Sequence, residues 1–207
     1  QNIGYQDKLM HKYWHFIDVP DPDGPGREPK VPNALTEIKL LTKALSGAAS
    51  DNVKSYDVVW LEHLVGDVHQ PLHATSRFTK NHPDGDQGGN LVRFCERPCR
   101  DELHAYWDGL LGDTPSLAEI KRMGNALRAT SKPGAASEAS PDAWIQESFQ
   151  LAQTSVYRPP ISEDNDPASP ISPRPDANYK KTALSVAKSQ VVLAGYRLAA
   201  LLNANLK

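Results

Sequence analysis

The stretch that decides the fold is WLEHLVGDVHQPLHA, residues 60–74. Apolar residues recur through it and through the preceding turns with helical spacing, which predicts a long, substantially buried helix from about residue 53 to residue 70. Its expected wide apolar face comprises Val58, Val59, Leu61, Leu64, Val65 and Val68. Pro71 must bend or end this helix, because a proline cannot continue the backbone hydrogen bonding.

The same stretch carries side chains that can bind a divalent metal. His63 and Asp67 are four residues apart, so on a helix they lie on one face about one turn apart. His73 follows the break at Pro71 and can turn toward the same region. Burying an ionised Asp beside imidazoles is costly unless a cation offsets its charge. The alternative is a group of core polar side chains that are satisfied by hydrogen bonds.

A second pair with the same spacing, His104 and Asp108, occurs in LHAYWD, residues 103–108. Taken alone, such a pair would more often lie on the surface. Joined to the first cluster, it predicts a multi-zinc hydrolase site, since imidazoles and carboxylates are common zinc ligands.

The remaining histidines have less distinctive surroundings. His69 is six residues after His63 and points to another side of the helix, so we expect a hydrogen-bonded core histidine rather than a ligand. His15 alternates with aromatic neighbours, which favours an extended segment and, read alone, a core histidine. We expect His11 and His82 to lie on the surface.

The rest of the chain predicts a mainly α protein with a single helical domain, residues 1–207, and long surface loops. Asn33 is expected to cap a helix that ends near Gly47. Further helices are expected at about residues 101–111, 116–129, 141–156 and 177–204. Loops rich in Pro, Gly or Asp are expected at residues 18–32, 75–92 and 158–176, with a strand-like stretch at residues 91–94.

Composition excludes some classes of function. The 207 residues carry a formal charge of −2, which argues against a protein that coats duplex phosphates with Lys and Arg. No apolar run approaches the length of about 18–20 residues that a membrane span needs. The two cysteines, Cys95 and Cys99, could form a disulfide, remain free thiols or contribute to a zinc site; a disulfide would mildly favour export.

Four motifs in order resemble those of a known family: WHFID (14–18), EHLVGDVHQPLHA (62–74), GGN (88–90) and LHAYWD (103–108). They are similar to the zinc-dependent single-strand nucleases and 3′-nucleotidases of fungi, plants and bacteria, which are related to bacterial zinc-dependent phospholipase C. The resemblance runs from about Tyr13 to Asp108. It implies a helical domain of the phospholipase C/nuclease type, with up to three Zn²⁺ ions at the base of a cleft.

The resemblance also implies roles for individual residues. His15, His63 and Asp67 would hold one zinc ion, and Asp67, the expected catalytic residue, would also bridge toward a third ion. The second ion would be held by three further side chains: His73, His104 and Asp108.

Substrate contacts follow from the same resemblance. Phe16 would stack on a nucleobase, Asp18 would accept hydrogen bonds from the base edge, and Asn90 would lie near the phosphate. An aromatic ring can stack on any base without reading its sequence. A carboxylate would repel a phosphate, so Asp18 is expected to face the N–H groups of a base. The alternatives are that Phe16 is a core residue and that Asp18 caps a turn.

The sequence also departs from the family pattern. The family's terminal Trp, a nearby His, a further Asp and a phosphate-binding Arg have no counterpart before Tyr13, so we expect that part of the native chain precedes Gln1. Only the second zinc site is then expected to be complete. Glu102 stands where family members commonly have Asn before the Leu-His pair. This difference changes the side chain expected in the pocket beside the second zinc site.

The prediction is a zinc-dependent phosphodiesterase that cleaves single-stranded RNA or DNA and 3′-nucleotides with metal-activated water. Two alternatives remain: a zinc-dependent phospholipase C, and a zinc-binding domain whose catalysis is impaired by truncation. The expected partner is single-stranded nucleic acid or a nucleotide. We also expect a monomer without a membrane span, in a secreted or periplasmic location.

Overall fold

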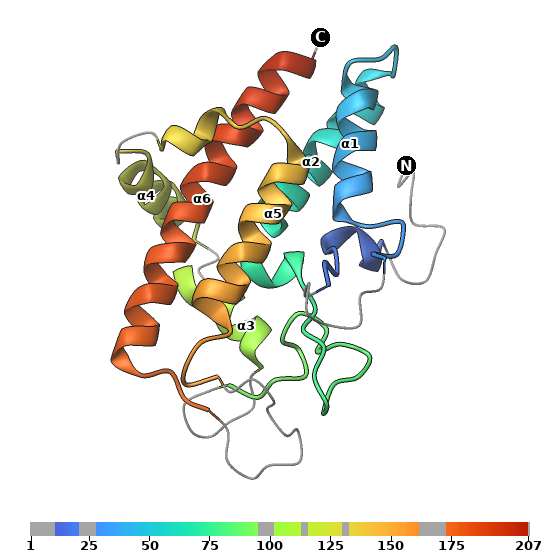
Figure 1. Ribbon diagram of the computed structural model, residues 1–207. Helices are drawn as coiled ribbons and strands as arrows, with labels where there is room; N and C mark the ends of the chain where they lie inside the picture. Colours follow the sequence, from blue (N-terminus) through green and yellow to red (C-terminus); the bar gives the residue numbers. More distant parts are fainter. Residues whose placement is uncertain are drawn as a thin grey trace.

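The computed structural model in Figure 1 describes residues 11–20, 28–94, 102–112, 116–129, 133–161 and 173–206. Within these ranges, the expected mainly α fold is confirmed. The α-helices are α1 (Ala34–Leu45), α2 (Asp51–Asp67), α3 (Leu103–Asp108), α4 (Leu117–Arg128), α5 (Pro141–Leu151) and α6 (Ala177–Asn205). Short helical segments connect them: η1 (Lys12–His15), η2 (Pro71–Ala74), η3 (Gly109–Leu111), η4 (Gly134–Ser137) and η5 (Ala152–Val156).

Helix α1 begins where the sequence predicts, because Asn33 caps it. The Asn33 side chain accepts a hydrogen bond from the Thr36 backbone N–H, and the Thr36 hydroxyl accepts one from the Asn33 backbone N–H. This reciprocal pair satisfies two N–H groups that would otherwise lack partners at the start of the helix. The helix ends at Leu45, close to the expected stop at Gly47.

Helix α2 is the long helix predicted around the quoted stretch, and it ends at Asp67, three residues before the expected end at Gln70. Its apolar face is narrower than expected, since Val59 is 63% exposed while Leu61, Leu64 and Val65 are buried. Pro71 then occupies the first turn of η2, where its missing N–H costs no helical hydrogen bond. The break therefore redirects the chain directly before His73.

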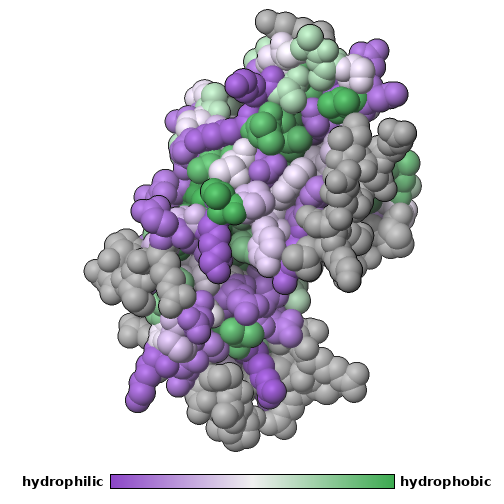
Figure 2. Space-filling model, turned by 90° about the vertical axis from the view of Figure 1, so that its right-hand side faces the viewer, coloured by the Kyte–Doolittle hydropathy of each residue, from purple (hydrophilic) through white to green (hydrophobic). Residues whose placement is uncertain are grey.

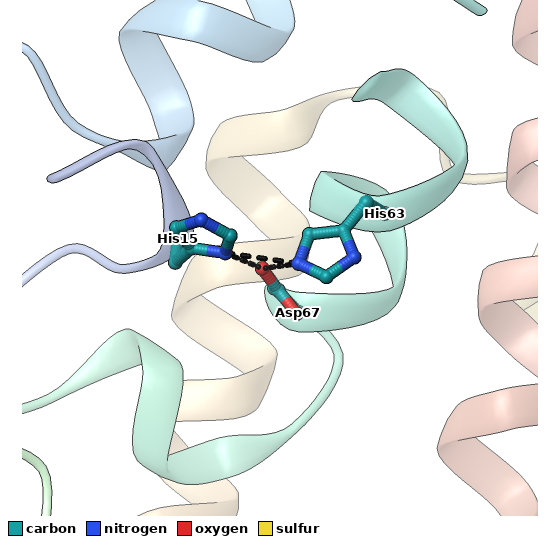
Figure 3. A group of neighbouring side chains, drawn as sticks. All are labelled: His15, His63 and Asp67. Carbon is teal, nitrogen blue, oxygen red and sulfur yellow. Dashed lines mark hydrogen bonds and ion pairs between the residues drawn. The ribbon is translucent and has the colours of Figure 1, made fainter. Parts of the chain in front are cut away.

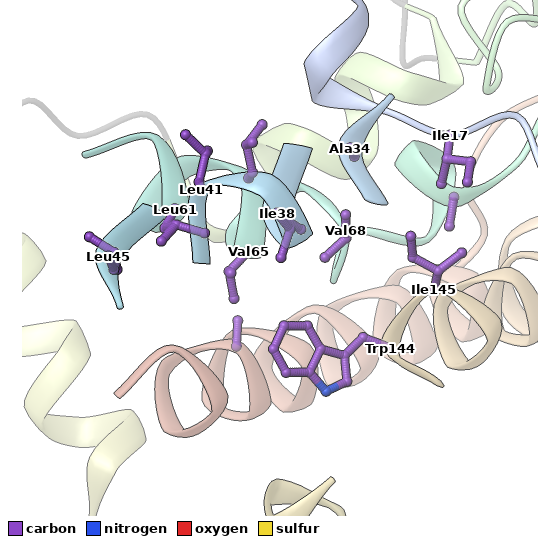
Figure 4. Packing of buried hydrophobic residues seen from close by; sticks show 13 residues of the cluster. Ile17, Ala34, Ile38, Leu41, Leu45, Leu61, Val65, Val68, Trp144 and Ile145 are labelled. Carbon is purple, nitrogen blue, oxygen red and sulfur yellow. The ribbon is translucent and has the colours of Figure 1, made fainter. Parts of the chain in front are cut away.

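A first hydrophobic core lies among α1, α2, α5 and α6 (Figure 4). Its buried members are Ile17, Ala34, Ile38, Leu41, Leu45, Leu61, Leu64, Val65, Val68, Ala74, Trp144, Ile145 and Ala194. Trp144 is one of its largest side chains and reaches it from α5. Burying these side chains stabilises the fold by roughly 1.5–3 kcal/mol for each large aliphatic or aromatic residue.

A second hydrophobic core holds α3 and the segments around it. Its buried members are Leu72, Val92, Phe94, Leu103, Trp107, Ala152, Val156, Ile161, Tyr179 and Ala183. Segment η2 contributes to both cores, through Ala74 to the first and through Leu72 to the second. His73 lies between these two anchors, so its backbone position is fixed from both sides.

Residues 12–15 form a 3-10 turn, so the expectation of an extended segment there is wrong. The expectation that His11 and His82 are surface residues is also wrong, because they are only 7% and 4% exposed. The His11 ring stacks on Trp14 with centroids 3.8 Å apart, and its Nε2 lies 3.2 Å from the Tyr56 hydroxyl. Tyr56 is 45 residues away from His11 in the sequence, so local sequence alone could not place this imidazole.

Residues 91–94 do not form the expected strand. In the described part of the chain, Arg93 makes an isolated antiparallel bridge with Glu102, and no strand extends from it. Val92 and Phe94 are instead buried in the second core. The strand-like apolar residues of this stretch therefore pack in a core and do not pair as a strand.

The described surface facing the viewer in Figure 2 is mostly hydrophilic, with hydrophobic side chains in small groups. Among the described helices, none is both long and apolar enough to cross a membrane. The expectations for Cys95 and Cys99, for the residues before His11 and for parts of the first and third predicted loops lie outside the described residues.

Candidate metal centre

Segment η1 and helix α2 bring His15, His63 and Asp67 together (Figure 3). Asp67 Oδ2 lies 3.0 Å from His15 Nδ1 and 3.2 Å from His63 Nε2, and these two ring nitrogens are 2.9 Å apart. His63 and Asp67 share one face of α2, as their spacing predicts. His15 completes the group from a segment that is 48 residues away from His63 in the sequence.

The second group contains His73 from η2 together with His104 and Asp108 from α3. The two imidazole Nε2 atoms are 3.1 Å apart, and each lies 3.6 Å from an oxygen of Asp108. The structure thus assembles all six predicted ligands as two groups of two imidazoles and one carboxylate.

Each group fits a divalent metal ion. In tetrahedral zinc sites the ligand bonds are about 2.0–2.2 Å long, which separates neighbouring ligand atoms by about 3.3 Å. The observed separations of 2.9–3.6 Å bracket that value. Both groups could therefore hold a metal ion with little rearrangement.

The orientation of the second pair of imidazoles supports the same conclusion. His73 Nδ1 lies 2.6 Å from the backbone oxygen of His15, and His104 Nδ1 lies 2.8 Å from that of Gly88. When Nδ1–H donates to a carbonyl, the Nε2 of a neutral imidazole is left as an acceptor. The two Nε2 atoms face each other at 3.1 Å, and either a shared proton or a metal ion between them offsets the repulsion of their lone pairs.

Charge within the groups is also suited to a cation. Burial alone would raise the pKa of Asp67, but hydrogen bonds from His15 and His63 and the charge of His73 lower it to about 2. Burial lowers the pKa of His104, which favours its neutral, ligating form. Hydrogen bonding to Asp67 raises the pKa of His63, and hydrogen bonding to Asp108 outweighs burial and raises the pKa of His73, so a metal ion bound at either group would compete with a proton on these imidazoles.

Gly88 explains how His104 is held. Its φ is +62°, and a Cβ placed there would come within 2.4 Å of the Leu72 backbone oxygen. Only glycine fits this close approach without strain. The glycine pair that marks the GGN motif thus lets a backbone carbonyl reach and orient a metal-ligand candidate.

Gln70 is a functional candidate that the sequence analysis did not identify. Its side-chain nitrogen donates to Asp108 Oδ1 over 2.9 Å, and its side-chain oxygen accepts from the Leu72 backbone N–H over 2.6 Å. One amide thereby caps the 3-10 helix carrying His73 and holds the carboxylate of Asp108. The sequence shows that Gln70 stands directly before Pro71, where it can cap the turn that carries His73. Its contact with Asp108 on α3 is visible only in the three-dimensional structure.

Replacing Gln70 with Met should weaken metal binding at the His73–His104–Asp108 group by about 10–100-fold, the usual effect of losing a partner that orients a ligand. Zinc titration followed by calorimetry measures this directly. Gln150→Met, an exposed change on α5, serves as the matched control and should leave both groups unaffected. Equal affinities in wild type and Gln70→Met would show that Gln70 does not position Asp108.

The predicted substrate-binding residues line one cavity of about 350 Å³ beside these groups. The cavity wall includes Phe16, Asp18 and Asn90 together with the ligand candidates His15, His73 and His104. Phe16 is half-buried, whereas its neighbour Ile17 enters the first core. The Asn90 side-chain nitrogen donates to the Gln87 backbone oxygen over 2.7 Å, which fixes the amide at the cavity.

Asp18 has an unusual electrostatic environment. Burial and the nearby charge of Asp86 raise its pKa to about 6, although Lys30 opposes this shift. Its carboxylate is thus only partly stabilised by protein groups and is suited to accept hydrogen bonds from a ligand. Asp18 lines the same cavity as Phe16, and its contact with a base edge stays a prediction.

His73 also lines a second cavity, of about 450 Å³. Its lining includes small and apolar residues of α6, among them Ala187, Val191 and Leu198, together with Asp67 and Asp108. The metal-ligand candidates therefore border two cavities of different character, one polar and aromatic and the other largely apolar.

His69 is a buried core residue, as expected. Its Nδ1 donates to the Val65 backbone oxygen over 2.7 Å, and its Nε2 accepts from Arg197 over 2.9 Å. Burial, together with the charge of Arg197, lowers its pKa to about 4. Neither ring nitrogen remains for a metal ion, so His69 is not a ligand.

The lowered pKa of His69 predicts acid sensitivity. The unfolded chain binds a proton at this residue near pH 6.5, but the folded protein resists doing so until about pH 4. Folding stability should therefore fall by about 3 kcal/mol as pH drops through this window. Urea unfolding of metal-free protein at both pH values, compared with His69→Gln, isolates the effect; an equal pH slope in the variant would contradict it.

Together, the fold and the site define a helical protein with two His/Asp groups that could hold metal ions. Residues 3–207 match the S1/P1 nuclease family, and the chain belongs to that family. This confirms the resemblance inferred from the four motifs.

Several plant proteins from Arabidopsis thaliana are similar to the chain. Endonuclease 4 is 26% identical over 165 residues, covering 74% of this chain and 53% of the relative. Endonuclease 3 is 31% identical over 157 residues, covering 70% of this chain and 50% of the relative. Endonuclease 5 is 29% identical over 174 residues, covering 74% of this chain and 53% of the relative. The chain spans about half the length of these curated relatives.

Proposed function

We propose that this protein is a zinc-dependent phosphodiesterase that cleaves single-stranded RNA and DNA and removes phosphate from 3′-nucleotides. The observation that carries the proposal is the adjacency of two His/Asp groups to a cavity lined by Phe16, Asp18 and Asn90. Membership of the S1/P1 nuclease family and the similarity to proteins named endonucleases support it.

In the proposed reaction, one zinc ion would be held by His15, His63 and Asp67, and another would be held by His73, His104 and Asp108. When bound, zinc would lower the pKa of a coordinated water molecule to about 7, which would supply a nucleophile for attack on phosphorus at neutral pH. Asp67 is the proposed catalytic residue because its ionised carboxylate contacts both imidazoles of its group. In the described part of the chain, no Ser or Cys side chain lines the cavity, so a protein nucleophile is not invoked.

Substrate binding uses the three other residues. Phe16 stacks on the nucleobase, which contributes about 1–3 kcal/mol for any base. Asp18 accepts hydrogen bonds from N–H groups on the base edge, and Asn90 donates to the phosphate. A cavity of about 350 Å³ suits one base turned out of its strand, which favours single-stranded substrates over a stacked duplex.

Parallel assays with a 3′-nucleotide, a single-stranded oligonucleotide and phosphatidylcholine test the proposal. With zinc present, we expect hydrolysis of the first two and none of the lipid. Lipid hydrolysis alone would instead support a phospholipase C. Zinc binding without turnover of any substrate would support a zinc-binding domain with impaired catalysis.

We further propose that the protein acts as a monomer in a secreted or periplasmic location, as the resemblance to the family suggests. The expected result is monomeric mass in light scattering and recovery of the protein outside the cytoplasm on fractionation. A stable dimer or a wholly cytoplasmic protein would contradict these two statements separately.

A further inference from the structure

Lys12 and Tyr13 lie on the same cavity wall as Phe16, although none of the proposed catalytic steps uses them. They come from segment η1, directly before the ligand candidate His15. Among the described residues that line this cavity, Lys12 is the only Lys or Arg.

Tyr13 is exposed, whereas a tyrosine that only stabilises the fold would be expected to bury most of its ring. Its side chain is 47% exposed, while its ring edge meets Phe16 with centroids 6.3 Å apart and planes at 66°. A neighbouring aromatic thus supports the ring from one side and leaves much of its surface open to solvent. An exposed ring beside a cavity is suited to stack on a flat ligand.

Lys12 adds a positive charge at the same place. Its Nζ lies 5.9 Å from the Tyr13 ring centroid, within the range of a cation–π contact. The lysine is itself exposed, and its flexible stem allows the ammonium group to reach an anion near the ring. An aromatic ring and a cation together match the two parts of a nucleotide, its base and its phosphate.

We propose that Lys12 and Tyr13 form a subsite for the nucleotide next to the one bound at Phe16, so that the preferred substrate is an oligonucleotide rather than a mononucleotide. This inference rests on the proposed function. The neighbouring base stacks on Tyr13, and its phosphate pairs with Lys12. A 3′-mononucleotide has no neighbouring unit and makes neither contact.

Kinetics of Tyr13→Ala and Tyr13→Phe with a 3′-mononucleotide and a single-stranded hexanucleotide test the aromatic part. For Tyr13→Ala we expect kcat/KM on the hexanucleotide to fall by about tenfold, as for loss of one stacked base. Hydrolysis of the mononucleotide should stay within about twofold of wild type. Tyr13→Phe keeps the ring and should restore the hexanucleotide rate.

Binding of a hydrolysis-resistant phosphorothioate hexanucleotide at several salt concentrations tests Lys12. In Lys12→Gln, the slope of log Kd against log salt should decrease by about 0.7, as for loss of one contact to a single-strand phosphate. Lys43→Gln removes the same charge from the exposed surface of α1 and should keep the wild-type slope.

Two outcomes would overturn the subsite. One is an equal loss on both substrates, which would indicate a general structural defect; the other is an unchanged hexanucleotide rate and salt slope. If wild type hydrolyses neither substrate, the proposed function fails, and the binding measurement then decides the subsite alone. An unchanged salt slope in Lys12→Gln would reject it in that case.

Discussion

Replacing Asp67 with Asn is expected to lower the cleavage of single-stranded oligonucleotides by about 10²–10³-fold, the scale at which one charged catalytic contact is lost. Asp67 accepts from both His15 and His63, and these contacts outweigh burial and lower its pKa to about 2. The amide of Asn carries no charge and would leave the two imidazoles without their shared anion. Oligonucleotide kinetics and zinc titration together measure the effect.

Asp57→Asn is the matched control because Asp57 is on the same helix and is 4% exposed. One of its carboxylate oxygens has no hydrogen-bond partner, and burial raises its pKa. Neutralising it should leave activity unchanged and stability equal or higher, since an isolated buried charge is costly. A comparable loss of activity in both variants would show that Asp67 acts through the stability of α2 and not through the metal group.

Replacing Arg197 with Met is expected to destabilise the protein by about 3–5 kcal/mol, as when one partner of a buried charged network is removed. Arg197 is 1% exposed and donates to His69, to the Ala135 backbone oxygen and to Glu147. It thereby ties α6 to α5, to η4 and to the segment that directly follows α2. Urea unfolding of the metal-free protein measures the free-energy difference.

Lys188→Met provides the comparison for Arg197, since it removes a charge from an exposed position on the same helix. Its effect should stay within about 0.5 kcal/mol. If Arg197→Met were no more destabilising than Lys188→Met, the buried network would contribute nothing to stability.

The helices could be predicted because their local signals are strong. Asn33 begins α1 with a side-chain cap, and Pro71 follows soon after the end of α2. The pairs His63–Asp67 and His104–Asp108 could be predicted for a related reason, since each pair is spaced four residues apart on a helix, whereas only the family resemblance assigns His15 as a ligand. Such spacing fixes relative position before any tertiary contact forms.

Other features depend on contacts between distant segments and could not be predicted. His11 is buried by Trp14 and Tyr56, and residues 91–94 pack in a core instead of pairing as a strand. The joint role of Gln70 at His73 and Asp108 requires η2 and α3 to lie side by side. Local periodicity carries no information about such partners.

Zinc stoichiometry tests the proposal that six imidazole and carboxylate side chains form two metal sites. Direct metal analysis after equilibration with zinc should give about two ions per chain, one for each group of three ligands. His63→Ala and His104→Ala should each lose one of them while the fold persists. Wild-type protein that binds no zinc, or variants that keep the full complement, would contradict the account.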